Sequence, residues 1–234
     1  MLHQIRASKL LAEALLLPGC FIFGLMYLFS VFTDWIWNQS LLETSGVITG
    51  ILCVYLAARN NIWSWPIAII SVLIYIFIFF EAKLYADTGL QVYFLLMNFY
   101  GWYFWSRKDE RKKVPVSSIS LKEIILSVAG IVVFTAGLGF FLYKGTDASF
   151  PFVDSFCTAC SLVAQVFLAR KVLENWLIWI FVDIIYVGVY ISKDLHLTAG
   201  MYALYIIIAA IGYHDWRKEY QGSRVLLREQ DQIV

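Results

Sequence analysis

Residues 58–75 read ARNNIWSWPIAIISVLIY and residues 169–186 read ARKVLENWLIWIFVDIIY, and the two stretches align when 111 is added to the first set of numbers. Both begin with Ala-Arg, carry a Trp seven positions later and end with Ile-Tyr. Further pairs follow at the same offset without a gap: Leu84 and Leu195, Gly89 and Gly200, Gly101 and Gly212, Trp105 and Trp216. We therefore predict an internal duplication, with one copy over 41–105 and the other over 152–216.

The composition is that of an integral membrane protein. Of the 234 residues, 61% are hydrophobic and only 15% are charged, and the mean hydropathy is +0.72. Apolar runs long enough to cross a bilayer recur along the chain, and they are apolar on every face, which excludes a β-barrel. We predict eight transmembrane helices, at about 17–37, 41–58, 63–80, 89–105, 119–143, 152–170, 175–192 and 198–214.

The distribution of Lys and Arg predicts the orientation of these helices. If the N-terminus lies inside, only three of the 18 basic residues fall in outer loops, namely Lys83, Lys144 and Lys193. Since cytoplasmic loops are enriched in Lys and Arg, both termini are predicted to be cytoplasmic. The net charge of +1 gives no reason to expect a nucleic-acid partner.

The predicted fold is all-α, with two parallel three-helix repeats joined by one linker helix and preceded by one extra helix. The copies have the same orientation because three helices plus one linker helix make an even number of crossings. Parallel repeats of this kind are common in transporters, whose substrates bind where the repeats meet. The expected boundaries are an N-terminal segment over 1–40, a first repeat over 41–106, a basic connector and linker helix over 107–146, a second repeat over 147–216 and a polar cytoplasmic tail over 217–234.

Polar side chains within the predicted helices are the candidates for a binding site, because they are costly in a bilayer and normally face a bundle interior or a water-filled cavity. Gln91 and Asn98 are seven residues apart and share one helix face, with Trp102 four residues further on. Gln165, on the predicted helix over 152–170, is a third such amide. The alternative is that these amides only join helices.

Asp183 is the most unusual residue, since it is an acid near the middle of an apolar helix. Trp176, Trp179 and Tyr186 share its face, which predicts a wall that stacks a flat ring and attracts positive charge. The alternative is that Asp183 is protonated or hydrogen-bonded to a neighbouring helix and only stabilises the bundle.

Seven of the nine Trp residues fall into two predicted groups. An interfacial belt accounts for Trp35, Trp37, Trp63 and Trp105. The candidates for stacking against a ligand are Trp65, Trp176 and Trp179.

Motifs for enzyme chemistry are absent from the sequence. It contains no phosphate-binding glycine loop, no HExxH and no GxSxG. Cys157 and Cys160 have the spacing of metal ligands but no second pair to complete a site, so we expect no metal and no cofactor.

Three segments carry a specific family resemblance: NIWSWPIAIISVLIY (61–75), EAKLYADTGLQVYFLLMNFYGWYFW (81–105) and NWLIWIFVDIIYVGVY (175–190). In these segments the chain resembles the bacterial PnuC vitamin B3 transporters, over about residues 40–218. In outline the repeat arrangement also resembles the SWEET sugar transporters.

The resemblance implies uptake of nicotinamide riboside by facilitated diffusion across the inner membrane. A cytoplasmic kinase would trap the substrate by phosphorylation, and the transporter would be a homotrimer in the lipid bilayer. The expected substrate-binding residues are Gln91, Asn98, Trp176, Trp179, Asp183 and Tyr186, to which position alone adds Gln165. Alternating access would follow from rocking of the two repeats around this site.

Three alternatives remain open from the sequence. The ligand could be a different ring-containing vitamin such as thiamin, or a sugar. A membrane enzyme would need an acid/base pair or a metal cluster, which the sequence does not supply. A structural or receptor subunit would have no substrate-sized polar cavity and would pair Asp183 within the bundle.

Overall fold

The computed structural model describes residues 41–81, 85–107, 114–146, 149–192 and 196–231. The chain divides into two compact units, Met1–Ser45 and Gly46–Val234, and the features below belong to the second. The named elements of the described residues are all helices: α2 (Leu41–Ala58), α3 (Ser64–Glu81), α4 (Tyr85–Ser106), α5 (Leu121–Gly145), α6 (Pro151–Ala169), α7 (Asn175–Ser192) and α8 (His196–Asp231). The all-α prediction is therefore confirmed, and the predicted helix over 17–37 lies outside the described residues.

Four of these helices are long and apolar enough to cross a membrane, namely α3, α5, α6 and α7. The apolar part of α2, Thr44–Ala58, is shorter than the length required of a span. The count of eight transmembrane helices stays a prediction.

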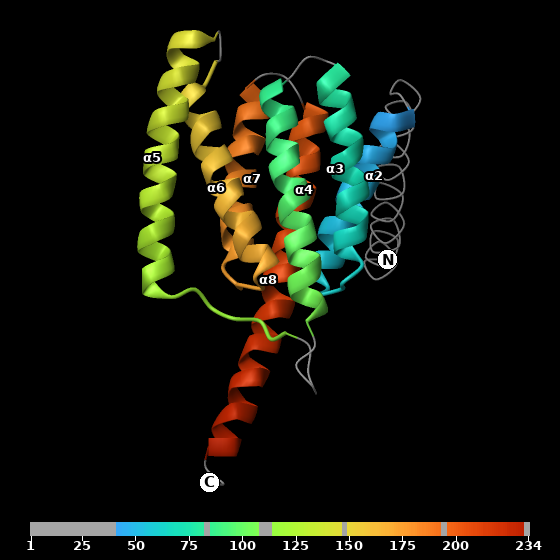
Figure 1. Cartoon of the computed structure of the whole chain (residues 1–234), viewed down its shortest axis with the longest axis vertical. Helices are drawn as coiled ribbons and strands as arrows, with labels where there is room; N and C mark the ends of the chain where they lie inside the picture. Colours follow the sequence, from blue (N-terminus) through green and yellow to red (C-terminus); the bar gives the residue numbers. More distant parts are fainter. Residues whose placement is uncertain (1–40, 82–84, 108–113, 147–148, 193–195, 232–234) are drawn as a thin grey trace, which may run out of the picture. The chain divides into compact units, whose positions relative to one another are not determined.

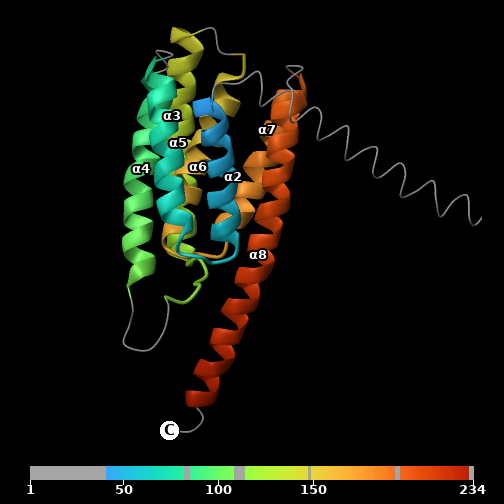
Figure 2. The same ribbon diagram turned by 90° about the vertical axis from the view of Figure 1, so that its right-hand side faces the viewer.

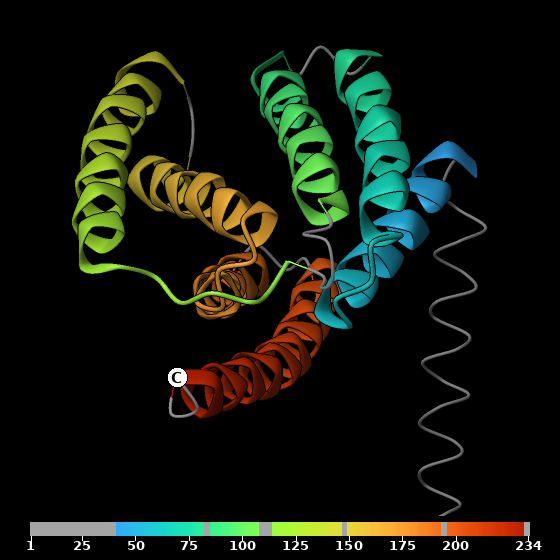
Figure 3. The ribbon, with the colours of Figure 1, turned by 60° about the horizontal axis from the view of Figure 1, so that its bottom comes forward.

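The helices of the second unit pack mainly in sequential pairs (Figure 1). The main contacts join α3 to α4, α5 to α6 and α7 to α8, and α6 also contacts both α4 and α7. Figure 3 shows the α3–α4 and α5–α6 pairs on separate sides of the α7–α8 pair. Helix α6 therefore links the two halves of the bundle, and it is the most buried of the four span candidates.

Gly101 and Gly212 permit close approaches in two of these pairs, α3–α4 and α7–α8. A Cβ atom added to Gly101 on α4 would lie 2.3 Å from the ring of Trp65 on α3. A Cβ atom added to Gly212 on α8 would lie 2.7 Å from the ring of Trp176 on α7. Real Cβ atoms do not approach other atoms so closely, so each Trp ring packs directly on a helix backbone where only glycine leaves room.

The turns that follow α2 and α6 have the same hydrogen bonds at an offset of 111. Asn60 and Lys171 both have positive φ, at 51° and 55°. The amide of each donates to the carbonyl three residues earlier, Ala57 in one turn and Leu168 in the other, at 2.9 and 3.1 Å. The amides of Arg59 and Arg170 likewise donate to Tyr55 and Val166, at 3.1 and 3.0 Å. We call the end of the bundle that carries these two turns the turn end.

Four tryptophans fill the interior at the turn end. Trp65, Trp105, Trp216 and Trp176 form a chain of ring contacts with centroid separations of 5.1, 5.6 and 5.4 Å, and each is at most 6% exposed. We call these four residues the tryptophan cluster. The predicted placement of Trp105 in an interfacial belt was wrong, because its indole packs against Trp65 and Trp216 instead. Trp63 is 64% exposed, and Trp35 and Trp37 lie outside the described residues.

The connector that precedes α5 is hydrogen-bonded to the turn that follows α6. Ser117 accepts a hydrogen bond from the amide of Leu173 and donates one to the carbonyl of Lys171, at 2.8 and 2.9 Å. Lys171 Nζ donates to the carbonyl of Val114 at 3.0 Å and lies 4.5 Å from the centroid of the Trp105 ring. The lysine is 2% exposed, so its ammonium group satisfies part of its hydrogen-bonding need inside the protein.

The last helix is longer than the sequence indicated. A transmembrane helix ending near 214 was predicted, followed by a polar cytoplasmic tail, but α8 continues without a break to Asp231 (Figures 1 and 2). Two interactions with the turn that follows α2 stabilise the part of α8 beyond Tyr213. Arg59 Nη1 forms an ion pair with Asp215 Oδ2 at 2.7 Å, and Asn60 Nδ2 donates to Glu219 Oε2 at 2.5 Å.

Candidate functional site

A cavity of about 330 Å³ lies between α2, α3, α4, α6, α7 and α8. Its wall is mostly aromatic and aliphatic, with polar groups from each of these helices. The polar and aromatic residues of the wall are Cys53, Ser64, Trp65, Ser71, Tyr75, Gln91, Phe94, Asn98, Gln165, Trp176, Trp179, Asp183, Tyr202 and Tyr205. A concave apolar site with a few polar groups is the form that small-molecule sites usually take.

Three amides predicted from the sequence lie on this wall, and two of them are joined. Gln165 Nε2 on α6 donates to Asn98 Oδ1 on α4 at 3.0 Å, and both residues are buried. Tyr93 Oη donates to the carbonyl of Leu162 at 3.0 Å and adds a second link between the same helices. The pair leaves the amide NH₂ of Asn98 and the carbonyl oxygen of Gln165 for a ligand, while Gln91 lies on the cavity wall about two turns before Asn98 on α4.

Asp183 lies on the cavity wall as predicted and is 5% exposed. Among the described residues it forms no hydrogen bond and no ion pair, and no Lys or Arg lines the cavity. The alternative that Asp183 only joins neighbouring helices requires a hydrogen-bond partner for its carboxyl, and the described residues supply none. A buried carboxyl without a partner is unfavourable, so its position suits a ligand that donates hydrogen bonds or carries positive charge.

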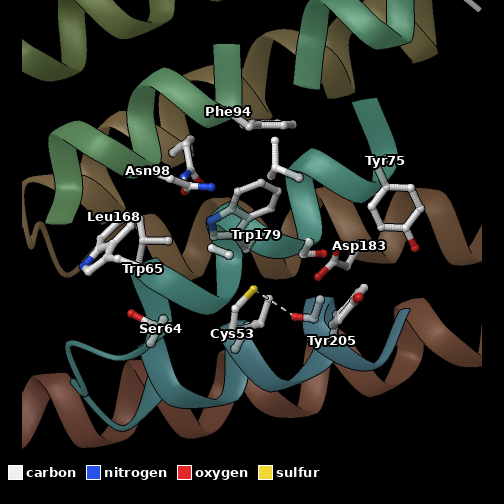
Figure 4. Close-up of a pocket in the computed structure, with 18 of the residues that line it drawn as sticks. Cys53, Ser64, Trp65, Tyr75, Phe94, Asn98, Leu168, Trp179, Asp183 and Tyr205 are labelled. Atoms are coloured by element: carbon white, nitrogen blue, oxygen red, sulfur yellow. Dashed lines mark hydrogen bonds between the residues drawn. The ribbon is translucent and has the colours of Figure 1, made fainter. Parts of the chain in front are cut away.

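Figure 4 shows how the aromatic part of the wall is arranged. Trp179 lies between Asn98 on one side and Asp183 on the other, with Phe94 above it in this view. Trp65 and Trp176, from the tryptophan cluster, close the cavity toward the turn end. The indole nitrogens of these two residues and the hydroxyl of Ser64 are buried without a hydrogen-bond partner among the described residues.

Two residues expected to face the ligand are not on the wall. Trp102 is 40% exposed and does not line the cavity, because it lies on the outward side of α4. Tyr186 does not line the cavity either, and its ring instead packs against Tyr190 and Tyr202 at 5.9 and 5.0 Å. One face of a helix extends over many turns, whereas the cavity spans only a few of them. A residue that shares a helix face with Asp183 therefore does not have to line the cavity.

Sequence reasoning missed most of the lining from α2, α3 and α8. Tyr202 could have been found, because it occupies the position of Gln91 in the other copy of the predicted duplication. Nothing in the local sequence distinguishes Ser64, Ser71 or Tyr205 from ordinary helix residues.

A match to a known protein family covers most of the chain. The profile of the nicotinamide mononucleotide transporter family matches residues 40–218. The chain belongs to this family. Its members are membrane transporters and not enzymes, and the matched region contains every residue of the cavity wall.

Relatives within the family differ in the ligand for which they are named. The nicotinamide riboside transporter PnuC of Escherichia coli K12 is 30% identical over 218 residues, covering 81% of this chain and 91% of the relative. The riboflavin/roseoflavin transporter RibM of Streptomyces davaonensis is 26% identical over 175 residues, covering 73% and 82%.

The crystal structure of the vitamin B3 transporter PnuC has the same fold. It superimposes with a TM-score of 0.64 at 26% identity, covering 84% of this chain and 89% of the other. The chain is therefore a multi-pass membrane transporter with the PnuC fold, as the sequence resemblance predicted.

Proposed function

We propose that the chain transports nicotinamide riboside, with Asp183 binding the positively charged ring. The observation that carries this proposal is the buried carboxyl of Asp183, unpaired among the described residues, in a cavity with tryptophan walls. The nicotinamide ring of the riboside is flat and carries a permanent positive charge. It can stack on Trp179 or Trp176 while its charge compensates that of Asp183.

The amide groups suit the other half of this molecule. A ribose presents several hydroxyls that both donate and accept hydrogen bonds. The free NH₂ of Asn98, the free carbonyl oxygen of Gln165 and the side chain of Gln91 offer both donors and acceptors. The proposed substrate-binding residues are thus Gln91, Asn98, Gln165, Trp176, Trp179 and Asp183, without Tyr186.

The charge of the cavity favours the riboside over the phosphorylated mononucleotide. A phosphate group would bring negative charge into a cavity that already holds Asp183 and whose described lining residues include no Lys or Arg. A neutral flavin, as suggested by the name of the RibM relative, would stack on the tryptophans but leave Asp183 without a partner. Thiamin is cationic, so it suits the charge of Asp183 better than a sugar does and is the stronger alternative to the riboside.

We further propose alternating access between two repeats, one containing α2–α4 and the other α6–α8. Two features support this proposal. The turns after α2 and α6 have corresponding hydrogen bonds at an offset of 111, and two Trp indoles donate hydrogen bonds in a reciprocal manner between the proposed repeats. Trp105 Nε1 on α4 donates to the carbonyl of Ala169 at 3.1 Å, and Trp216 Nε1 on α8 donates to the carbonyl of Ala57 at 3.2 Å. Each proposed repeat thereby holds the turn of the other, and these bonds would break when the turn end opens.

The mode of transport is proposed from the family resemblance, and the lack of ion coupling and the orientation are proposed from the charged residues of the chain. Transport would be facilitated diffusion, with phosphorylation by a cytoplasmic kinase retaining the substrate. Asp183 is the one acidic residue among the described residues of the wall, so the cavity offers no second carboxylate for ion coupling. Both termini and the turn end, which carries Arg59 and Arg170, would face the cytoplasm of the inner membrane.

We also propose a homotrimer in the bilayer. Helix α5 contacts mainly α6, and only 6% of its apolar stretch is buried, so most of its surface is available to lipid or to another copy. Native mass spectrometry from detergent should give three times the mass of the 26.9 kDa chain. A monomer mass at every detergent concentration would contradict the trimer.

Calorimetric titration of the purified protein in detergent tests the substrate. Nicotinamide riboside is titrated beside nicotinamide, the mononucleotide, thiamin, riboflavin and glucose. We expect binding of the riboside and none of the mononucleotide, since only the latter brings phosphate near Asp183. Binding of riboflavin or thiamin in place of the riboside would retain the transporter and replace its substrate.

A further inference from the structure

A chain of four tyrosines extends from the cavity wall along α7 and α8. Tyr186 and Tyr190 come from α7, and Tyr202 and Tyr205 come from α8. Their ring centroids are 5.9 Å apart for Tyr186–Tyr190, 5.0 Å for Tyr186–Tyr202, 5.2 Å for Tyr190–Tyr202 and 6.0 Å for Tyr202–Tyr205. We call these four residues the tyrosine track.

The track connects the cavity with the end of the bundle opposite the turn end. Tyr202 and Tyr205 line the cavity, whereas Tyr186 and Tyr190 lie beyond it. Tyr190 is two residues before the end of α7 at Ser192, and it follows Trp176 by 14 residues, or about 21 Å of helix. The tryptophan cluster therefore closes one end of the cavity, and the track leads toward the other.

The position of these phenols in the chain is not explained by packing alone. At an offset of 111 the corresponding residues are Tyr75, Phe79, Gln91 and Phe94, so the other half of the bundle has two phenylalanines and an amide there. Phenylalanine or leucine would fill the same space without a hydroxyl that must find a partner at membrane depth. Four touching phenols on one side of the cavity suggest a role in handling the ligand.

We propose that the tyrosine track is the route by which the ligand ring reaches the cavity, and that it selects flat, positively charged rings. This inference rests on the proposed function. The negative face of a phenol attracts a pyridinium ring, and Asp183 lies where the track meets the cavity.

The pair Tyr190–Tyr202 shows how a ring could pass. The two rings are stacked, with an angle of 18° between their planes. A ligand ring that enters between them replaces one stacking contact with two, one on each of its faces. Separation of the phenols is thereby compensated by the ligand, and an aliphatic ligand of equal size would gain less.

The experiment compares Tyr190→Leu with Tyr190→Phe, because Tyr190 does not touch the cavity and Phe keeps the ring. Each variant is purified, titrated with nicotinamide riboside and assayed for uptake in proteoliposomes. Uptake is also measured with the reduced riboside, which is uncharged and of nearly equal size. For Tyr190→Leu we expect a Kd within about twofold of the parent and a kcat/KM for riboside uptake lower by about fivefold or more.

The pattern across ligands and variants decides the inference. Tyr190→Phe should retain uptake, and Tyr190→Leu should lose part of the preference for the charged over the reduced riboside. Unchanged uptake by Tyr190→Leu would overturn the track, as would an equal loss of binding and uptake in both variants. If Tyr190→Leu does not fold, as judged by gel filtration, Tyr190→Met replaces it as the variant without a ring.

Failure of the track is distinct from failure of the substrate proposal. If the parent protein binds riboflavin or thiamin instead of the riboside, the substrate proposal fails and the same variants are assayed with the ligand that binds. A parent that binds none of these ligands in a folded state overturns both.

Discussion

At the scale of single residues, Asp183 and the amide pair carry the proposed recognition. The carboxyl of Asp183 is buried and unpaired among the described residues, whereas Asn98 and Gln165 already bond to each other. The acid can therefore gain most from a cationic ligand, and the amides are held in place before the ligand arrives. Preorganisation of this kind lowers the entropy lost on binding.

Replacement of Asp183 by Asn should weaken riboside binding with little change in shape. A desolvated charge pair contributes about 2 kcal/mol or more, so we expect a Kd raised roughly 30-fold or more. Titration calorimetry measures this change, and Asp154→Asn is the matched control, since Asp154 lies on α6 away from the cavity wall. Equal affinities for Asp183→Asn and the parent would exclude charge recognition by this residue.

Asn98→Ala and Gln165→Ala should each weaken binding by about 1–2 kcal/mol, because each removes a ligand contact and leaves its partner amide unpaired. Since the two side chains share one hydrogen bond, the double variant should lose less than the sum of the single losses. A double-mutant cycle of calorimetric affinities tests this. Strict additivity would show that the Asn98–Gln165 bond has no part in organising the site.

At the scale of elements, the Trp–Gly contacts determine how α3 meets α4 and how α7 meets α8. Trp65 packs on the backbone at Gly101, and Trp176 packs on the backbone at Gly212. The two indoles also form part of the cavity wall. The packing of each helix pair therefore positions a side chain of the site.

Gly212→Ala should lower the stability of the bundle, because the new Cβ would lie 2.7 Å from the Trp176 ring. Overpacking of this kind costs about 1–3 kcal/mol, and it should also weaken ligand binding as Trp176 shifts. Thermal unfolding in detergent measures the stability. Gly130→Ala on α5 is the control, since a Cβ there meets nothing within 4 Å, and it should leave the midpoint unchanged or raise it slightly, because Ala is favoured over Gly within a helix. Equal midpoints for both variants would contradict the tight contact.

At the scale of the whole second unit, the reciprocal bonds of Trp105 and Trp216 join the two proposed repeats. The ion pair of Arg59 with Asp215 is partly exposed and adds little energy by itself. The buried indole bonds are better protected from water, so the equilibrium between open and closed turn ends should depend mainly on the tryptophans.

Trp216→Phe should favour opening of the turn end, because it removes the bond to the Ala57 carbonyl, worth about 1 kcal/mol or about fivefold in the equilibrium. Cys53 on the cavity wall provides a reporter in a background that lacks Cys20, Cys157 and Cys160. We expect faster labelling of Cys53 by a maleimide added at the turn-end side, and slower labelling with riboside present. Labelling at the parent rate would argue against this bond as part of a gate.

The sequence by itself determined the class of the protein and its all-helical fold, and it pointed to the family. Long apolar runs predict helices because a bilayer allows no unpaired backbone, and the segments over 61–75, 81–105 and 175–190 indicated PnuC-like transport. The polar residues were also visible, because any amide or acid in such a helix is costly. Asp183, Asn98, Gln165 and Gln91 were therefore identified before their surroundings were known.

Only the tertiary structure decided which aromatic residues line the cavity and which pack elsewhere. Trp105 belongs to a buried cluster, Trp102 is exposed, Tyr186 lies beyond the wall, and Tyr202 and Tyr205 complete the wall from α8. An aromatic ring is equally stable at an interface, in a core or against a ligand, so its type and periodicity cannot distinguish these positions. The length of α8 was likewise beyond local reasoning, since Asp215 and Glu219 meet Arg59 and Asn60 from a distant part of the chain.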